Sequence, residues 1–118
     1  MGSRKALLKG KPEPLVKLYL ELEKTLKTLG GVEIVARGRY ALFRTTRIFA
    51  DLVFMREALR LAILLHREVE DPLFFKIQRM GRRVAHVAKL RSSAELRAVK
   101  PYLKEAYRFA QSEHYGKV

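Results

Sequence analysis

The sequence predicts an α+β domain, with a helix near each end of the chain and β-strands between them. Three patterns support this prediction: apolar residues recur at helical spacing over residues 15–29, apolar and polar residues alternate over residues 32–44, and helical spacing returns from residue 93 onward. A chain of 118 residues can bury one sizeable core but not two. We therefore expect a single domain over residues 13–118, preceded by a basic, loosely ordered segment over residues 1–12.

The first helix has clear start and stop signals. Pro14 suits the first helical position, where its missing N–H is not needed, and Gly30-Gly31 ends the helix. A strand follows over residues 32–37, and the next strand leads into a hairpin tip at RTTR, residues 44–47. This tip lacks the Asn-Gly or Asp-Gly pair that marks a strongly predicted turn.

Residues 48–66 are compatible with two structures. They could form one helix with an apolar face, or two strands, of which the second places four apolar side chains on one side of a sheet: Leu59, Leu61, Ile63 and Leu65. Local propensity slightly favours the helix, although tertiary contacts often override such preferences. Residues 71–80 begin with an N-cap signal and a proline, and they predict either a short helix or a loop.

The last third of the chain predicts a strand followed by a helix. RRVAHVAKLR, residues 82–91, has strand character, and SSAE, residues 92–95, matches a capping box at a helix start. The helix runs toward His114. We expect a kink or break near Pro101, because proline lacks the N–H that a helix interior uses.

Charge is the most informative property of the whole chain. Lysine and arginine total 25 against 12 acidic residues, which gives a formal net charge of +13. An excess of this size attracts polyanions and steers their association. The chain has no cysteine, so disulfides and thiolate metal sites are excluded. Frequent arginine together with the absence of asparagine and cysteine is typical of thermophile proteins.

No apolar run approaches the roughly 20 residues of a membrane-spanning helix. The basic start of the chain also lacks the apolar centre of a signal peptide. We therefore expect a cytoplasmic protein that does not associate with membranes.

Motifs for catalysis or metal binding are missing from the sequence. His66, His86 and His114 have no paired metal-ligand spacing, and no glycine-rich phosphate loop or nucleophile elbow occurs. HREVED, residues 66–71, could imitate a metal or acid–base site, but an acidic loop is the better interpretation. His86 lies among apolar neighbours, which favours a hydrogen-bonded structural role. We expect no enzymatic activity, no cofactor and no metal.

Two basic stretches without acidic residues remain as a candidate site. The predicted nucleic-acid-binding residues are seven arginines: Arg37, Arg39, Arg44, Arg47, Arg79, Arg82 and Arg83. A guanidinium group suits phosphate because its planar fork donates two hydrogen bonds at once. Tyr40 could stack on an exposed base, although a core position is the competing interpretation.

The sequence thus predicts a non-enzymatic nucleic-acid-binding or nucleic-acid-associated module. Motifs that read base sequence are missing, so we expect phosphate contacts with DNA or RNA and weak sequence preference. The alternative is a protein-interaction or oligomerisation module that uses an apolar sheet face or the C-terminal helix. The apolar segments FADLVFM and LRLAILL are the basis of this alternative.

The order of several pieces resembles a known family. A GKP start precedes a helix with LYLEL, and then come YALFRTTRIFADL, LRLAILL, GRRVAHVAKLRS and a closing LKEAYRFA. This order is similar to the bacterial and archaeal domain-of-unknown-function family numbered 5655, over about residues 7–110. The resemblance implies helices at each end packed on one antiparallel sheet, for which we expect four to five strands. It also implies two strands for residues 48–66.

The family resemblance carries limited functional information. Its domains stand alone or lie beside nuclease-like domains, which implies a link with nucleic-acid transactions. The family has no agreed activity and no catalytic residues that could be transferred to this chain.

Overall fold

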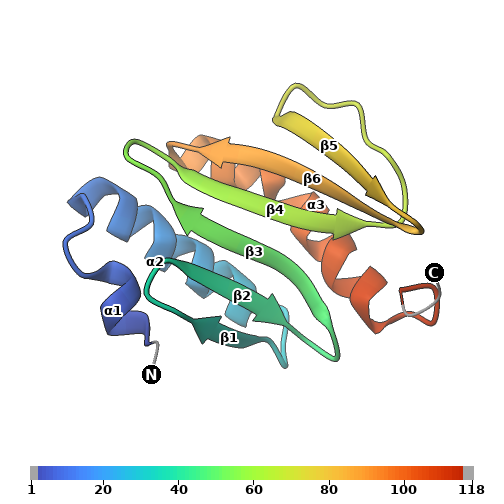
Figure 1. Cartoon of the computed structure of the whole chain (residues 1–118), viewed down its shortest axis with the longest axis horizontal. Helices are drawn as coiled ribbons and strands as arrows, with labels where there is room; N and C mark the ends of the chain where they lie inside the picture. Colours follow the sequence, from blue (N-terminus) through green and yellow to red (C-terminus); the bar gives the residue numbers. More distant parts are fainter. Residues whose placement is uncertain (1–2, 116–118) are drawn as a thin grey trace.

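The computed structural model describes residues 3–115, which form a layer of helices on one side of a single β-sheet (Figure 1). The helices are α1 (Arg4–Leu8), α2 (Glu13–Lys27) and α3 (Ser93–Gln111). The strands are β1 (Glu33–Ala36), β2 (Tyr40–Arg44), β3 (Ile48–Phe54), β4 (Leu59–Leu65), β5 (Phe74–Met80) and β6 (Arg83–Leu90). Neighbouring strands are antiparallel in the order β1-β2-β3-β4-β6-β5. The predicted α+β class, with an antiparallel sheet and helices at both ends, is confirmed.

The sheet has six strands, so the expected number of four to five is wrong. The missed strand is β5, in the segment that predicted a short helix or a loop. The Asp71 carboxylate accepts from Leu73 N–H as a helix N-cap would, but only one turn follows, closed by Phe74 N–H donating to the Asp71 carbonyl over 2.9 Å. The backbone of β5 then pairs with β6, and this tertiary pairing overrides the local signal.

Residues 48–66 form the two strands β3 and β4, as the family resemblance implies. They are joined by a turn in which Met55 N–H donates to the Ala58 carbonyl over 2.9 Å. The RTTR segment is the predicted tip between β2 and β3, and the β2–β3 register shifts at Phe43/Arg44. As a strand, β4 buries Leu59, Leu61, Ile63 and Leu65 on one side of the sheet. In a helix, these alternate residues would point in different directions around the helix axis.

Helix α3 continues through Pro101, so the expected kink or break does not interrupt it. Pro101 is exposed, and the carbonyl four residues before it can therefore hydrogen-bond to water in place of the missing N–H. At its start Ser92 Oγ accepts from Glu95 N–H, as in a capping box, whereas Glu95 Oε1 accepts from Arg91 N–H, one residue before the N-cap.

The core lies between the sheet and the two long helices. Helix α3 packs across β3, β4 and β6, and α2 packs beside it (Figure 1). Leu7 of α1 is fully buried, so the segment for which the sequence predicts loose order contributes to this core. The opposite side of the sheet, which faces the viewer in Figure 1, carries no helix and is called the open face here.

Candidate nucleic-acid interface

A row of side chains crosses the open face from strand to strand. The strand register places Tyr40 opposite Val53, Val53 opposite Arg60, and Arg60 opposite Lys89. The row ends at Phe75 of β5, whose ring centroid lies 4.8 Å from Lys89 Nζ. Two aromatic rings therefore flank two cations along one line across the sheet.

Both aromatic rings of this row are accessible. Tyr40 is 40% exposed and Phe75 is 50% exposed, among the largest values for apolar residues of the described chain. Phe75 owes its position to a bulge in β5, where the register shifts between Phe74 and Lys76. The bulge allows Phe74 to stay buried against the core while the next ring lies on the surface. Lys76 follows Phe75, is exposed and pairs with Val87 of β6. We call Tyr40, Arg60, Phe75, Lys76 and Lys89 the platform.

A hollow of ≈ 290 Å³ lies beside this row on the open face. Its depth comes from small side chains at the bottom, including Ala62 and Ala85. Polar side chains from three strands also line it: Asp51, Arg60, Lys76 and Gln78. Among the described residues Asp51 has no hydrogen-bond or ion-pair partner. Burial raises the pKa of Asp51, and the positive charge of Arg60 opposes that rise. The carboxylate can therefore accept a hydrogen bond from a ligand.

Two of the four predicted arginines of the first hairpin contact other parts of the fold. Arg44 Nη2 lies 2.7 Å from Glu33 Oε1 on the neighbouring strand. Arg47 Nη1 donates to the carbonyls of Ala110 and Ser112, at 3.2 and 2.7 Å, and so holds the C-terminal end of α3.

The second predicted group is also partly engaged. Arg79 Nε lies 3.3 Å from Glu68 Oε1. The guanidinium carbon of Arg83 lies 4.6 Å from the ring centroid of Tyr115, which Arg47 approaches from 5.4 Å. Arginines 47 and 83 therefore bind the same buried aromatic ring.

Three predicted arginines contact no carboxylate or aromatic ring among the described residues. Arg37 and Arg39 lie in the β1–β2 connection, and Arg82 lies in the β5–β6 turn. The two connections lie at opposite ends of the sheet, because strand direction reverses between neighbours. The structure therefore does not bring the seven predicted arginines into one surface.

The sequence reasoning did not select Arg60, Lys89 or Phe75. Lys89 lies in the second basic stretch, and in LRLAILL the alternation sets Arg60 apart from the leucines. Arg60 was not selected because the prediction used only basic stretches without acidic residues, and Arg60 lies outside both of them. For Tyr40, the exposed ring rules out the competing core position.

A second basic surface lies on α3, on the helix side of the molecule. Its members are exposed and have no ion pair among residues 3–115: Arg97, Lys100, Lys104 and Arg108. No exposed large apolar side chain of the described residues accompanies them on α3. This surface has charge without the aromatic rings of the platform.

The acidic loop HREVED stabilises its surroundings. Asp71 accepts hydrogen bonds from Leu73 N–H and from the Tyr102 hydroxyl, and both lower the pKa of its carboxyl group. Glu68 binds Arg79, and the His66 ring stacks on the ring of His114, with centroids 5.0 Å apart. Among the described residues no group of three potential ligands could hold a metal ion.

His86 is a buried histidine with both ring nitrogens engaged. Its Nε2 accepts from Val69 N–H and its Nδ1 faces the Val84 carbonyl, each over 2.9 Å. The ring is therefore neutral, with the proton on Nδ1. Burial lowers the pKa of His86, because a charged ring would be desolvated and could no longer accept from Val69.

This arrangement predicts acid sensitivity. The unfolded chain binds a proton on His86 near pH 6.5, whereas the folded chain does so only at lower pH, so stability falls as the pH drops below 6.5. The free energy of unfolding should fall by up to about 1.4 kcal/mol for each pH unit below 6.5 through His86 alone. Urea unfolding at pH 7 and pH 5 checks this.

His86→Leu is the control variant for this prediction. It should lower the free energy of unfolding at pH 7 by about 1–3 kcal/mol, because Val69 N–H loses its acceptor, but should show a smaller further loss at pH 5. An unchanged pH dependence would contradict the assignment.

Comparison with known proteins places the chain in a family. No helix of residues 3–115 has the length and apolar character to cross a membrane. Searches find no similar curated protein and no similar solved structure. A family model described as Domain of unknown function (DUF5655) matches residues 4–110, which include all the helices and strands except the last residue of α3. The chain therefore belongs to the DUF5655 family.

Proposed function

We propose that this protein binds single-stranded nucleic acid on the open face of its sheet and that its role is not enzymatic. The observation that carries the proposal is the cross-strand row in which Tyr40 and Phe75 flank Arg60 and Lys89. Exposed aromatic rings stack on unpaired bases, and cations between them neutralise the phosphates that connect those bases.

The dimensions of the row suit a short stretch of single strand. It crosses five strands, from β2 to β5, and four spacings of about 4.8 Å give roughly 19 Å. This distance accommodates a few nucleotides. A duplex fits less well, because its bases are paired and stacked and cannot lie flat on the platform.

Charge supports the same face. Arg60, Lys76 and Lys89 have no ion pair among the described residues, so their charges are available to phosphate. Asp51 is the exception within this surface, and the positive charge of the neighbouring Arg60 offsets its negative charge. Its oxygen atoms are suited to accept a hydrogen bond from a base amino group.

The exposed arginines of the sequence-based prediction extend this surface at its ends. We propose Arg37, Arg39 and Arg82 as additional phosphate contacts, and a cytoplasmic location in which nucleic acid is accessible. We assign a mainly structural role to the other four predicted arginines, because each already contacts a carboxylate, a carbonyl or an aromatic ring: Arg44, Arg47, Arg79 and Arg83.

A salt titration tests the proposal directly. Fluorescence anisotropy of labelled single-stranded DNA, single-stranded RNA and duplex DNA would be recorded between about 50 and 200 mM salt. The three platform cations alone should give a log–log slope for a single strand of about −2, at −0.7 per contact, and all six proposed contacts should give about −4. Single strands should bind several-fold more tightly than the duplex. Absence of binding at low salt, or equal affinity for the duplex, would overturn the proposal.

A second candidate function is protein interaction through the same open face. Ile48 and Met80 are 36% and 44% exposed there, which is unusual for large apolar side chains. If a protein is the natural ligand, Met80→Lys should weaken its binding strongly. The same variant should strengthen binding of a single-stranded oligonucleotide slightly, because it adds a cation beside the platform.

A further inference from the structure

We propose that β1 is a self-association surface, on which a second copy of this chain adds its own β1 in antiparallel orientation. The pairing is centred on Val35 and joins the two sheets edge to edge. This interface contains no residue of the platform and does not depend on the proposed function, although its Arg37 is also one of the proposed additional phosphate contacts.

The first step is that β1 has a free edge. It is the last strand of the sheet and pairs only with β2 among the described residues. On its other side the backbone of β1 pairs with no strand of residues 3–115, and the Ala36 carbonyl there accepts only a 3.5 Å hydrogen bond from the Arg37 guanidinium. Such an edge binds another extended strand through main-chain hydrogen bonds unless something covers it.

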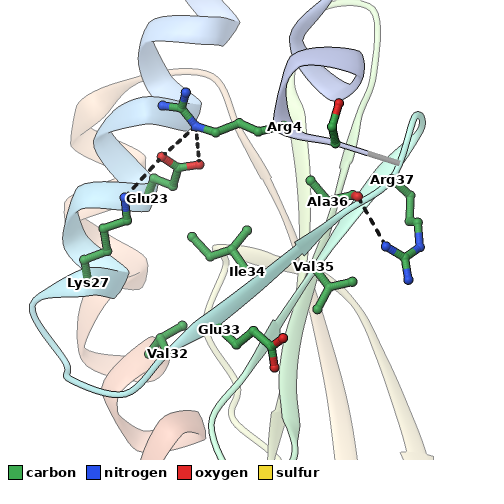
Figure 2. Close-up of a pocket in the computed structure, with 10 residues that line it drawn as sticks. Arg4, Glu23, Lys27, Val32, Glu33, Ile34, Val35, Ala36 and Arg37 are labelled. Carbon is green, nitrogen blue, oxygen red and sulfur yellow. Dashed lines mark hydrogen bonds and ion pairs between the residues drawn. The ribbon is translucent and has the colours of Figure 1, made fainter. Parts of the chain in front are cut away.

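The second step is the space beside this edge. A hollow of ≈ 400 Å³ is lined by the consecutive residues 32–37 and, across from them, by Arg4, Glu23 and Lys27 (Figure 2). The Ile34 side chain points toward α2 and is only half-buried. Side chains from an added strand could therefore enter the hollow and complete the burial of Ile34.

The buried acid of this hollow is already neutralised. Glu23 is 4% exposed, and Arg4 Nε donates to both of its carboxylate oxygens, at 3.1 and 2.9 Å. Lys27 Nζ lies 4.0 Å from Glu23 Oε1. An apolar side chain that enters the hollow would therefore contact an ion-paired carboxylate and not an unpaired one.

The third step is self-complementary charge. In antiparallel pairing about Val35, Glu33 lies opposite Arg37 of the second copy, and Ile34 lies opposite Ala36. Figure 2 shows Glu33, Val35 and Arg37 on the side of β1 that points away from α2. Two Glu33–Arg37 pairs therefore form on one face of the joined sheet, and two apolar pairs form on the other.

The charged groups are available for these pairs. Both Arg44 contacts to Glu33 use Oε1, so Oε2 is free of partners among the described residues. Among residues 3–115 the Arg37 guanidinium contacts only the carbonyl of its neighbour Ala36, at 3.5 Å. The other free edge, β5, carries Lys76 and Arg79 but no acid, so a second copy would meet like charges there.

Cysteine cross-linking tests the geometry, because the chain has no cysteine of its own. Val35→Cys places the thiol on the symmetry axis, where opposed Cα atoms about 4.5–5.5 Å apart permit a disulfide. Gln78→Cys, on the exposed part of β5, is the matched control for random collisions. We expect the Val35→Cys dimer to form at least about tenfold faster at equal protein concentration. Equal rates for the two variants would overturn the proposal.

Sedimentation of cysteine-free protein gives an independent measurement. The wild-type chain should show a reversible monomer–dimer equilibrium. Arg37→Glu should raise its dissociation constant roughly tenfold, because it replaces two attractive pairs by two repulsive ones. Circular dichroism would confirm that the exposed substitution leaves the fold intact. A strictly monomeric wild type, or an unchanged dissociation constant in Arg37→Glu, would refute a β1 interface.

Discussion

Replacing Arg60 and Lys89 together by glutamine should weaken binding of a single-stranded oligonucleotide at least about tenfold at low salt. The two side chains lie opposite each other at the centre of the platform, and neither has an ion pair among the described residues. Removing two phosphate contacts should also reduce the steepness of the log–log salt dependence by about 1.4. Anisotropy titrations at several salt concentrations measure both quantities.

The basic surface of α3 provides the matched control. Lys100→Gln/Lys104→Gln removes the same charge from exposed positions on the helix side of the molecule. This variant should keep its affinity within about twofold and should keep the salt slope. Equal losses in the two double variants would show that diffuse charge, and not the platform, binds the strand. Phe75→Ala complements the pair, because it should lower affinity while leaving the salt slope unchanged.

Leu61→Ala should lower the free energy of unfolding by about 2–5 kcal/mol. Leu61 is 1% exposed and faces the helices from the middle of β4, so the truncation leaves a cavity in the centre of the core. The loss should be visible as a lower urea midpoint with an unchanged slope.

Leu64 on the same strand is the control for this core substitution. It lines the hollow of the open face and is only half-buried, so Leu64→Ala should cost less than about 1 kcal/mol. Similar losses for both leucines would mean that the open face is covered in solution. In that case the platform would not be available to a ligand.

Much of the fold follows from local signals in the sequence. Pro14, the Gly30-Gly31 pair and the SSAE capping box mark helix ends through backbone constraints that act within a few residues. The exceptions are β5 and α3. Asp71 and Pro72 carry a helix-start signal but precede a strand, and Pro101 lies on an exposed helix face that tolerates it.

The candidate site was harder to predict, because residues that are neighbours in sequence are not neighbours on a sheet. A run such as RGRYALFRTTR suggests a basic cluster, yet alternation and turns send its arginines in different directions. Tyr40 and Arg60 are 20 positions apart in the chain, Arg60 and Lys89 are 29 apart, and all three meet only through strand register. The register depends on pairing partners that the sequence alone did not fix.

The position of β5 at the rim of the sheet has a dynamic consequence. This strand is held on one side only, by β6, so its amides should exchange with solvent through local opening before the central strands open. A ligand that contacts Phe75 and also Tyr40 would connect this edge strand to β2, near the opposite edge of the sheet. Ligand binding would then suppress the local opening of β5 by the factor 1 + [L]/Kd. Slower deuterium uptake by the amides of Phe74–Met80 would therefore report binding at this end of the platform.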